Sequence, residues 1–166
     1  MGGRSKVIFP GSFDPWTYAH QSILERACAL FDEVTVGVCK SPNHKKVYLA
    51  DDLRYRIIKQ VCQDKDNVQV KIFQGLVTGF CEQERCFNVI RGVRRAQDFQ
   101  YEWEMYHHNQ VLSEEIEWLL LPCRKEYMGV SSSLVKEIYQ HGGDITSWVP
   151  GHVIKAMEQQ RRVDGA

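Results

Sequence analysis

Apolar residues recur along this chain with two alternating periods, one typical of strands and one typical of helices. Continuous or every-second apolar positions predict five strands, at residues 7–9, 34–38, 68–72, 87–90 and 118–121. Apolar positions three or four residues apart predict helices within residues 23–31, 53–61, 76–84, 98–112, 134–138 and 153–157. Because strands separated by helices require crossover connections, the pattern predicts a doubly wound α/β fold with a five-stranded, mainly parallel sheet.

The predicted domain is a single one over residues 1–166, and we expect its ends, about residues 1–5 and 160–166, to be flexible. A chain of this length can bury a core without disulfide bonds. In doubly wound sheets, ligands bind beyond the carboxyl ends of the strands, where the strand order reverses. The segments after strands one, two, four and five are therefore the candidates for a functional site.

Composition narrows the classes of function. Lys plus Arg and Asp plus Glu each number 21, so the net charge is +0, and 43% of the residues are hydrophobic. These values exclude a disordered chain and provide no overall positive field for nucleic acid or an anionic membrane. No apolar run approaches the length of about 20 residues that a membrane span needs, and residues 1–6 contain no apolar signal segment. We expect a cytoplasmic protein that binds neither nucleic acid nor membrane.

The cysteine and histidine patterns argue against a metal centre built from side chains. The six cysteines contain no C-x-x-C pair, and several stand inside apolar segments, which is typical of reduced, buried thiols. A tetrahedral zinc site needs clustered ligands. The adjacent His107 and His108 diverge by about 100° on the predicted helix and cannot share one ion. No protein-ligated metal is predicted.

The segment after the first strand combines a glycine turn, a hydroxyl group and an imidazole. Residues 10–15 read Pro-Gly-Ser-Phe-Asp-Pro, and Thr17 and His20 follow at the start of a helix. A helix N-terminus favours an anion, so these residues could bind phosphate. The spacing matches neither a dinucleotide-binding nor a P-loop motif. The alternative is an ordinary turn and helix cap with His20 incidental.

A cluster of arginines follows the fourth strand. Residues 91–95 contain three arginines and Gly92, and Asp98 and Glu102 come next. Guanidinium groups bind phosphate oxygens in pairs, which suits a polyphosphate, and Gly92 allows close approach of a ligand. The alternative is a solvated charge run in which the arginines pair with Asp98 and Glu102.

Two further loops complete the candidate site. Residues 40–46 carry three lysines after the second strand, and residues 131–133 are three serines at a helix start after the fifth. Each is unremarkable alone, since serines commonly cap helices. Together, four loops at one sheet edge supply His, Lys, Arg and Ser without a general base or a cysteine nucleophile. This set suits transfer between phosphates, in which positioning and charge stabilisation provide most of the catalysis.

Three motifs together resemble the bacterial phosphopantetheine adenylyltransferase family. Residues 10–20 carry Thr17-x-x-His20, which resembles the T/H-x-G-H signature of the nucleotidyltransferase superfamily, and residues 91–102 and 130–137 resemble this family more specifically. The resemblance implies a Rossmann-like fold, usually a homohexamer. It also implies adenylyl transfer from ATP to 4′-phosphopantetheine, giving dephospho-coenzyme A and pyrophosphate, with Mg²⁺ bound mainly through ATP phosphates. Inhibition by coenzyme A is a further expectation from the same resemblance.

The resemblance also assigns residues to roles. It implies that His20 stabilises charge on the α-phosphate and that Ser12 touches both substrates. The catalytic set is His20, Lys45 and Arg94, and the phosphopantetheine side is Ser12, Lys45, Val77 and Arg91. The ATP site is expected to comprise Ser12, Phe13, His20, Gly92, Val93, Arg94, Glu102, Tyr127, Met128, Gly129, Val130, Ser131, Ser132 and Ser133.

Three positions depart from the family pattern. Tyr18-Ala19 stands where Asn-Gly is usual, and we expect the added bulk to reduce ATP affinity or to shift the pocket. The loop after the second strand is one residue longer, so either Lys45 or His44 fills the position of the loop lysine. Gly75 replaces a common acidic residue.

Two alternative functions share the same motifs. One is a nucleotidyltransferase for another phosphate, such as nicotinamide mononucleotide or glycerol phosphate, because the first motif serves the whole superfamily. The other is a non-catalytic nucleotide- or coenzyme A-binding protein, for which Tyr18-Ala19 is the only support.

Overall fold

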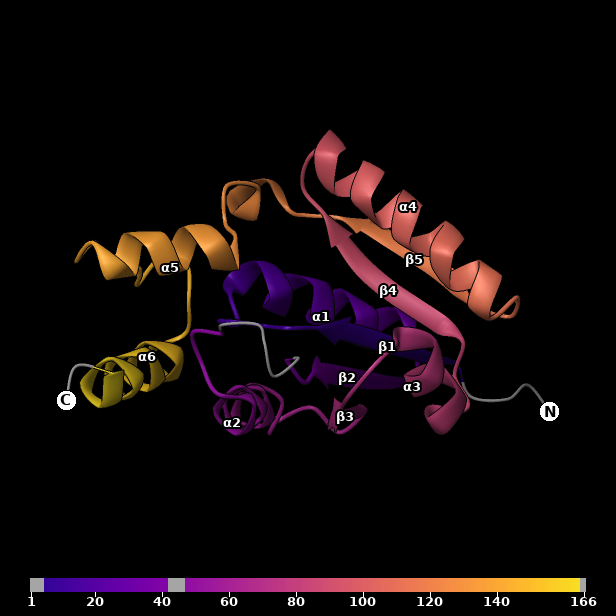
Figure 1. The fold of residues 1–166 in the computed structure, drawn as a ribbon, viewed down its shortest axis with the longest axis horizontal. Helices are drawn as coiled ribbons and strands as arrows, with labels where there is room; N and C mark the ends of the chain where they lie inside the picture. Colours follow the sequence, from indigo (N-terminus) through magenta and orange to yellow (C-terminus); the bar gives the residue numbers. More distant parts are fainter. Residues whose placement is uncertain (1–4, 42–46, 165–166) are drawn as a thin grey trace.

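The computed structural model describes residues 5–41 and 47–164. Its centre is a five-stranded sheet in which every neighbouring pair is parallel, in the order β3-β2-β1-β4-β5 (Figure 1). The strands are β1 (Lys6–Gly11), β2 (Glu33–Cys39), β3 (Val68–Phe73), β4 (Asn88–Val93) and β5 (Glu117–Pro122). The chain runs outward from β1 to β3 and then returns to the other side of β1. The strand order therefore reverses between β1 and β4, which confirms the doubly wound prediction.

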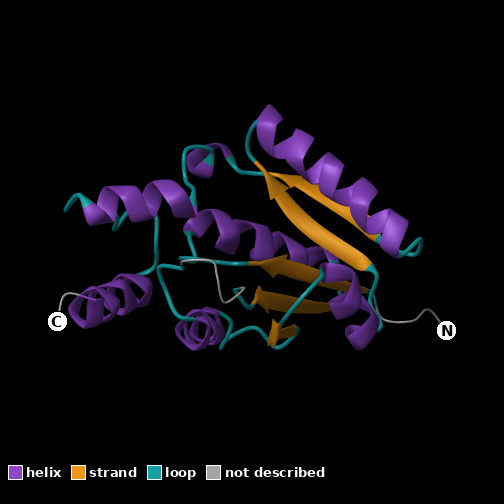
Figure 2. Ribbon diagram, in the orientation of Figure 1, coloured by secondary structure: helices purple, strands orange, loops and turns teal. Residues whose placement is uncertain are grey.

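Among the described residues, four α-helices connect the strands, and a short 3₁₀ helix and two further α-helices follow β5 (Figure 2). They are α1 (Tyr18–Leu30), α2 (Asp51–Val61), α3 (Val77–Glu84), α4 (Ala96–Leu112), η1 (Lys125–Tyr127), α5 (Ser132–Gln140) and α6 (Gly151–Asp164). The 3₁₀ helix was not expected from the sequence. Helix α6 continues through residues 160–164, whereas residues 1–4 and 165–166 lie outside the described residues, so flexibility there stays a prediction.

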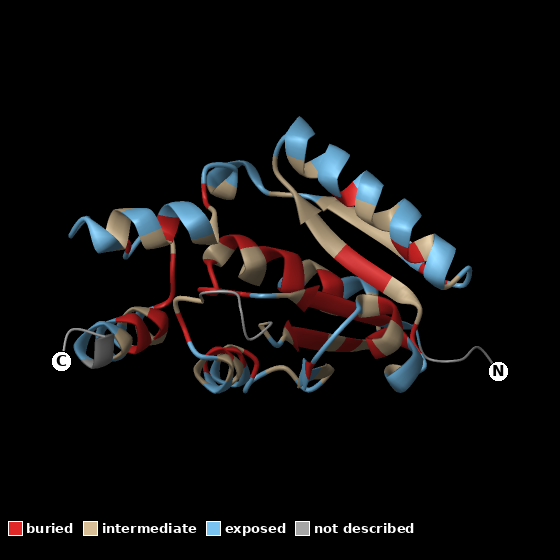
Figure 3. Cartoon of the chain, in the orientation of Figure 1, coloured by how far each residue is buried: buried red, intermediate tan, exposed pale blue. Residues whose placement is uncertain are grey.

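The central strands are buried on both faces of the sheet by different helices (Figure 3). Val7 and Phe9 of β1 pack with α1, α2 and α6, while Ile8 between them packs with Phe80 of α3 and Val89 of β4. Strands covered on both faces read as continuous apolar runs rather than alternating ones. This explains why the first strand was recognisable from three consecutive apolar residues.

Strand β1 extends further than expected, because Pro10 and Gly11 belong to it instead of ending it. Both stay paired with β2, opposite Gly37 and Val38. On the other side, the described register with β4 consists of Ile8 opposite Val89. Pro10 has no N–H group to donate to a neighbouring strand. The carboxyl ends of β1 and β4 therefore separate, which leaves space where the strand order reverses.

Helices α5 and α6 lie beyond the carboxyl ends of β1 and β2 (Figure 1). The N-terminus of α5 thus faces the separated strand ends. Among the described helices, none is both long and apolar enough to cross a membrane.

Candidate active site

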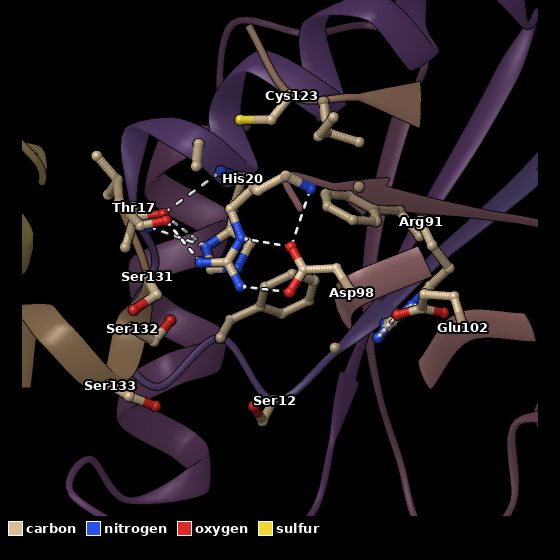
Figure 4. A pocket seen from close by; sticks show the side chains of 18 of the residues that line it. Ser12, Thr17, His20, Arg91, Asp98, Glu102, Cys123, Ser131, Ser132 and Ser133 are labelled. Atoms are coloured by element: carbon tan, nitrogen blue, oxygen red, sulfur yellow. Dashed lines mark hydrogen bonds and ion pairs between the residues drawn. The ribbon is translucent and has the colours of Figure 1, made fainter. Parts of the chain in front are cut away.

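A cavity of about 480 Å³ opens between the carboxyl ends of β1 and β4 (Figure 4). It is lined by the end of β1 with the turn after it, the start of α1, the end of β4 with part of α4, Cys123 after β5, and the segment from Val130 to the start of α5. The predicted site residues found in its lining are Ser12, Phe13, His20, Arg91, Gly92, Arg94, Glu102, Val130, Ser131, Ser132 and Ser133. Of the four loops that the sequence predicted to converge, those after β1, β4 and β5 line the cavity, whereas residues 42–46 of the loop after β2 lie outside the described residues.

Other predicted ATP-site residues do not line this cavity. Val93 is the last residue of β4, and Tyr127 and Met128 lie in or next to η1. Gly129 lines an adjoining hollow of about 420 Å³, which shares Arg94 with the main cavity. A part in nucleotide binding stays a prediction for these four residues.

Two assignments for the phosphopantetheine side are not found in the lining of the cavity, one because it lies elsewhere and one because it is outside the described residues. Val77 is the first residue of α3, which follows the edge strand β3, and it does not line the cavity. Lys45 and His44 lie outside the described residues, so the choice between them is not decided.

Thr17 and His20 form a reciprocal capping box at the start of α1. The Thr17 side chain accepts from the His20 backbone N–H, at 3.5 Å, and the Thr17 backbone N–H donates to Nδ1 of His20, at 3.0 Å. Two helix-terminal N–H groups are thereby satisfied. Since Nδ1 accepts this hydrogen bond, the proton of the neutral ring is on Nε2. The spacing of the Thr17-x-x-His20 motif thus fixes both the orientation and the tautomer of the imidazole.

The imidazole of His20 is held in its neutral form. Burial, followed by the positive charges of Arg91 and Arg94, lowers the pKa of His20 from 6.5 to about 3. Each of these causes disfavours a positive charge on the ring. At neutral pH the ring is therefore a hydrogen-bond donor through Nε2 and not an imidazolium.

Arg94 is oriented by Asp98 one turn further along the chain. Its Nε and backbone N–H donate to Oδ2 of Asp98, at 3.0 and 2.9 Å, and Nη1 donates to the Val130 carbonyl, at 2.8 Å. Burial acts to raise the pKa of Asp98, but the hydrogen bonds and the charge of Arg94 outweigh it and keep that pKa below its ordinary value. The pair links the end of β4 to the loop before α5, and the Arg94 side chain held in this way lines the cavity.

Arg91 pairs in the same way with Glu102. Its Nε lies 2.9 and 3.0 Å from the two carboxylate oxygens of Glu102, and Nη1 donates to the Pro10 carbonyl. Glu102 is buried and also accepts from Nε1 of Trp118, at 2.9 Å. Both arginines therefore pair with the acidic residues that the alternative interpretation named, yet all four side chains line the cavity. Pairing and ligand binding are compatible here, because a guanidinium carries five N–H groups.

Two of the three serines at the start of α5 have distinct structural roles. Ser131 is the N-cap, with its side chain accepting from the Leu134 backbone N–H at 3.1 Å. Ser132 donates to the Pro15 carbonyl at 2.8 Å, which ties α5 to the segment before α1. Together with Ser133 they present hydroxyl groups and a helix N-terminus to the cavity (Figure 4). Such an arrangement favours an anion.

Ala19 and Tyr18 stand where the family usually has Gly and Asn, and Ala19 lines the cavity while Tyr18 does not. Ala19 is buried in the cavity wall. The ring of Tyr18 stacks on Tyr127 of η1, with centroids 6.4 Å apart and planes at 28°, and it is not part of the lining. The Tyr18 side chain thus contacts η1, and the expected effect of Tyr18-Ala19 on ATP affinity or on the pocket stays a prediction.

A neighbouring side chain leaves little space for any residue larger than glycine at position 92. A Cβ atom added at Gly92 would lie 2.9 Å from Cγ1 of Ile23 in α1. Close packing of α1 on β4 therefore excludes a larger residue. The sequence argument had considered only the approach of a ligand.

Several lining residues were missed by the sequence argument. Asp98 was named only as a partner for the arginines, and Thr17 only as part of a motif. Tyr101 and Cys123 were not considered as site residues, although both line the cavity. Their positions next to Glu102 and Pro122 could have suggested them, since residues beside strand ends and site carboxylates share the same edge.

Comparison with known proteins relates this site to one family. The cytidylyltransferase-like family model matches residues 8–138. The phosphopantetheine adenylyltransferase of Finegoldia magna is 37% identical over 157 residues, which cover 95% of this chain and 96% of that protein. The enzyme of the same name from Hamiltonella defensa is 39% identical over 152 residues, covering 92% and 97%. This chain is a member of the phosphopantetheine adenylyltransferase family, within the cytidylyltransferase-like proteins.

Solved structures agree on the fold of this family. A nicotinic acid mononucleotide adenylyltransferase of Plasmodium falciparum, complexed with NaAD, has a TM-score of 0.73 at 14% identity, covering 98% of both chains. A putative nicotinate-nucleotide adenylyltransferase of Vibrio parahaemolyticus has a TM-score of 0.70 at 17% identity, covering 95% of this chain and 93% of the other. At these identities the likeness shows the nucleotidyltransferase fold and not the substrate.

Proposed function

We propose that this protein transfers the adenylyl group of ATP to 4′-phosphopantetheine, giving dephospho-coenzyme A and pyrophosphate, a step of coenzyme A synthesis. The observation that carries the proposal is a neutral imidazole, with its proton on Nε2, in a cavity with two arginines and a helix N-terminus. This set provides hydrogen-bond donors and positive charge. Identity of 37–39% to phosphopantetheine adenylyltransferases over most of the chain supports the choice of substrate.

The reaction needs stabilisation of charge more than activation of a nucleophile. A phosphate oxygen of phosphopantetheine attacks the α-phosphorus of ATP, a new P–O bond forms, and the bond to the β-phosphate oxygen breaks. The attacking phosphate is already ionised near neutral pH, since its second pKa is about 6. No general base is required. Pyrophosphate leaves with the electron pair of the broken bond.

His20 is expected to donate from Nε2 to an oxygen of the α-phosphate. A neutral donor fits this role, because it remains protonated on Nε2 throughout the reaction and needs no proton uptake. Preorganised donors of this kind typically contribute about 10²–10³-fold to the rate. The Thr17 cap fixes the ring, so little reorganisation accompanies the transition state.

The remaining charge is expected to be divided between the two arginines and α5. Arg94 and the N-terminus of α5 are suited to the β- and γ-phosphates, and Arg91 to the acceptor phosphate. Lys45 is proposed to contribute by the resemblance alone, since it lies outside the described residues.

Mg²⁺ is proposed to enter with the nucleotide. The carboxylates of Asp98 and Glu102 in the cavity lining both pair with arginines, and the described residues contain no group of three or more His, Cys, Asp or Glu side chains that could hold a metal ion. Mg²⁺ keeps several waters and commonly binds substrate phosphates. When bound, it offsets charge on the triphosphate.

We also propose that the protein works in the cytoplasm as a homo-oligomer, a hexamer by resemblance, with coenzyme A as an inhibitor. Support for assembly comes from α4, whose aromatic residues Phe99 and Trp103 are 49% and 52% exposed. Their rings stack with centroids 6.0 Å apart, and His107 continues the same stripe. A stripe of exposed aromatic rings is typical of a surface covered by another chain.

The proposal is tested by pyrophosphate release from the purified protein with ATP, Mg²⁺ and a panel of acceptors. We expect release that depends on 4′-phosphopantetheine, with dephospho-coenzyme A formed in equal amount. Nicotinamide mononucleotide with ATP and glycerol 3-phosphate with CTP serve as controls for the other members of the superfamily. Release with one of these controls in place of phosphopantetheine would replace the proposed substrate. ATP binding without release from any acceptor would favour a non-catalytic protein.

A further inference from the structure

The described part of the chain contains a fully buried arginine that the proposed chemistry does not use. Arg54 of α2 is 0% exposed and does not line the cavity. Each of its five guanidinium N–H groups has an acceptor. The acceptors are the carbonyl oxygens of Ser12, Cys39 and Leu49 and the side chains of Ser41 and Asp51.

These acceptors come from segments that meet at the carboxyl edge of the sheet. Cys39 is the last residue of β2, and Ser12 follows the last residue of β1. Beyond the ends of strands, carbonyl groups lose their ladder partners and need other donors. Arg54 supplies those donors for both strands from one rigid, planar group. Burial of a charged side chain is costly. A complete set of partners for Arg54 therefore indicates a specific structural purpose.

The bond to Ser12 acts on the part of the site next to the reaction. Phe13, the next residue, has a φ of 48°, a conformation that bulky side chains adopt only when their surroundings impose it. The Phe13 ring meets the His20 ring edge-on, with centroids 5.2 Å apart. The position of the Ser12 carbonyl is therefore transmitted through Phe13 to the imidazole.

The same turn is held from its other side by a residue of the site. Arg91 of β4 donates to the Pro10 carbonyl, as Arg54 of α2 donates to the Ser12 carbonyl. Asp14 adds a third restraint, because its carboxylate accepts from the Leu49 backbone N–H at 2.8 Å. The turn that carries Ser12 is thus held from both sides of the position where the sheet opens.

We propose that Arg54 is a positioning residue for adenylyl transfer, which holds the turn after β1 so that Ser12, Phe13 and His20 stay in their reactive arrangement. It acts through the backbone of Ser12 and touches no substrate. The inference rests on the proposed function for its catalytic readout. It also has a readout in ATP binding, which does not depend on the identity of the acceptor.

The test is Arg54→Lys, which keeps the positive charge but has three donors on one atom in place of a planar fork. If the fork positions the turn, kcat for pyrophosphate release falls about 10²-fold, the effect typical of a misplaced reactive group. The Kd for ATP, measured by titration calorimetry, rises about tenfold, as expected when a hydrogen bond to a charged group is lost nearby. Both are measured well below the melting temperature of the variant.

A purely structural role is separated by matched controls. Ile116 is fully buried in the cluster of side chains on the opposite face of the sheet and does not line the cavity. Ile116→Val and Ile116→Ala provide graded losses of melting temperature, and we expect their kcat and ATP Kd to stay within about twofold of the unmodified protein. Asp51→Asn is a milder second variant, which weakens one partner of Arg54 and should lower kcat about fivefold.

The outcomes are distinguishable from those of the proposed function. The proposal is supported if Arg54→Lys and Asp51→Asn have a lower kcat and a higher ATP Kd than Ile116 controls of equal melting temperature. Values that follow the controls in both kcat and ATP Kd would overturn it and leave the proposed function intact. If the unmodified protein releases no pyrophosphate with phosphopantetheine, the proposed function fails, and the ATP Kd alone decides the role of Arg54.

Discussion

At the scale of single residues, the site depends on how side chains restrain one another. Thr17 sets the tautomer of His20, Asp98 orients Arg94, and Glu102 orients Arg91. Each reactive group is thereby held by a neighbour from the same chain segment or from the adjoining helix. Such pre-arrangement is what a transfer between phosphates requires, because most of the catalysis comes from fixed charge and fixed geometry.

The neutral state of His20 leads to a prediction for its titration. The pKa in the fold, about 3, lies below the ordinary value of 6.5, so the unfolded chain takes up the proton first. Ring signals of His20 in ¹⁵N-edited NMR should show the Nε2–H tautomer and stay constant from pH 8 to pH 5. Stability linked to this group is complete above pH 6.5 and declines as the pH falls toward 3. A titration midpoint near 6.5 in the free protein would refute the prediction.

Among whole elements, the contact between α1 and η1 involves a residue that departs from the family pattern, Tyr18. Tyr18 begins α1 and stacks on Tyr127 of η1, and η1 leads into Val130 and the serines of the cavity. The unusual tyrosine therefore braces the segment before α5. Its backbone N–H also donates to the Trp148 carbonyl at 2.9 Å, which joins the start of α1 to the segment before α6.

Replacing this tyrosine by the residue usual in the family tests the brace. An aromatic pair contributes about 0.5–1.5 kcal/mol beyond its area. Tyr18→Asn should therefore raise the KM for ATP about two- to fivefold while kcat changes little, and Tyr18→Phe, which keeps the ring, should leave both unchanged. Steady-state kinetics with varied ATP measures this. A lower KM in Tyr18→Asn would instead mean that Tyr18 obstructs the nucleotide.

For the whole molecule, the five parallel strands and their helices could be predicted from the sequence. The strands and helices stood out as runs or repeats of apolar residues, and the first strand was a continuous run because both faces of the central strands are covered. The meeting of the loops after β1, β4 and β5 followed from the rule for parallel sheets. The extension of β1 through Pro10 could not be predicted, because it depends on pairing with β2 alone.

The pairing within the site was less accessible to sequence reasoning. Arg54 was missed, although it shares a helical face with Ile57, Ile58 and Val61, and an arginine among apolar positions is a usable signal. The orientation of Tyr18 could not be predicted, because it depends on η1, which has no periodic pattern. Charge runs likewise do not reveal whether they pair with each other, bind a ligand or do both.

Assembly is the other property that belongs to the whole molecule. If the aromatic stripe of α4 is covered by another copy, Trp103→Glu should reduce the mass measured by light scattering, because a charge would be buried without a partner. His108→Glu places the same charge on an exposed position about 100° away from His107 and should leave the mass unchanged. Equal masses for all three proteins would remove the support that α4 gives to an oligomer.

The central claim is that a neutral His20 stabilises the transition state of adenylyl transfer. The most direct measurement is kcat for pyrophosphate release from ATP and 4′-phosphopantetheine, together with the Kd for ATP, in the unmodified protein and in His20→Ala. The account predicts that kcat falls about 10²–10³-fold while the ATP Kd changes by less than about tenfold. An equal, modest change in both quantities would contradict it, because His20 would then bind substrate and transition state alike.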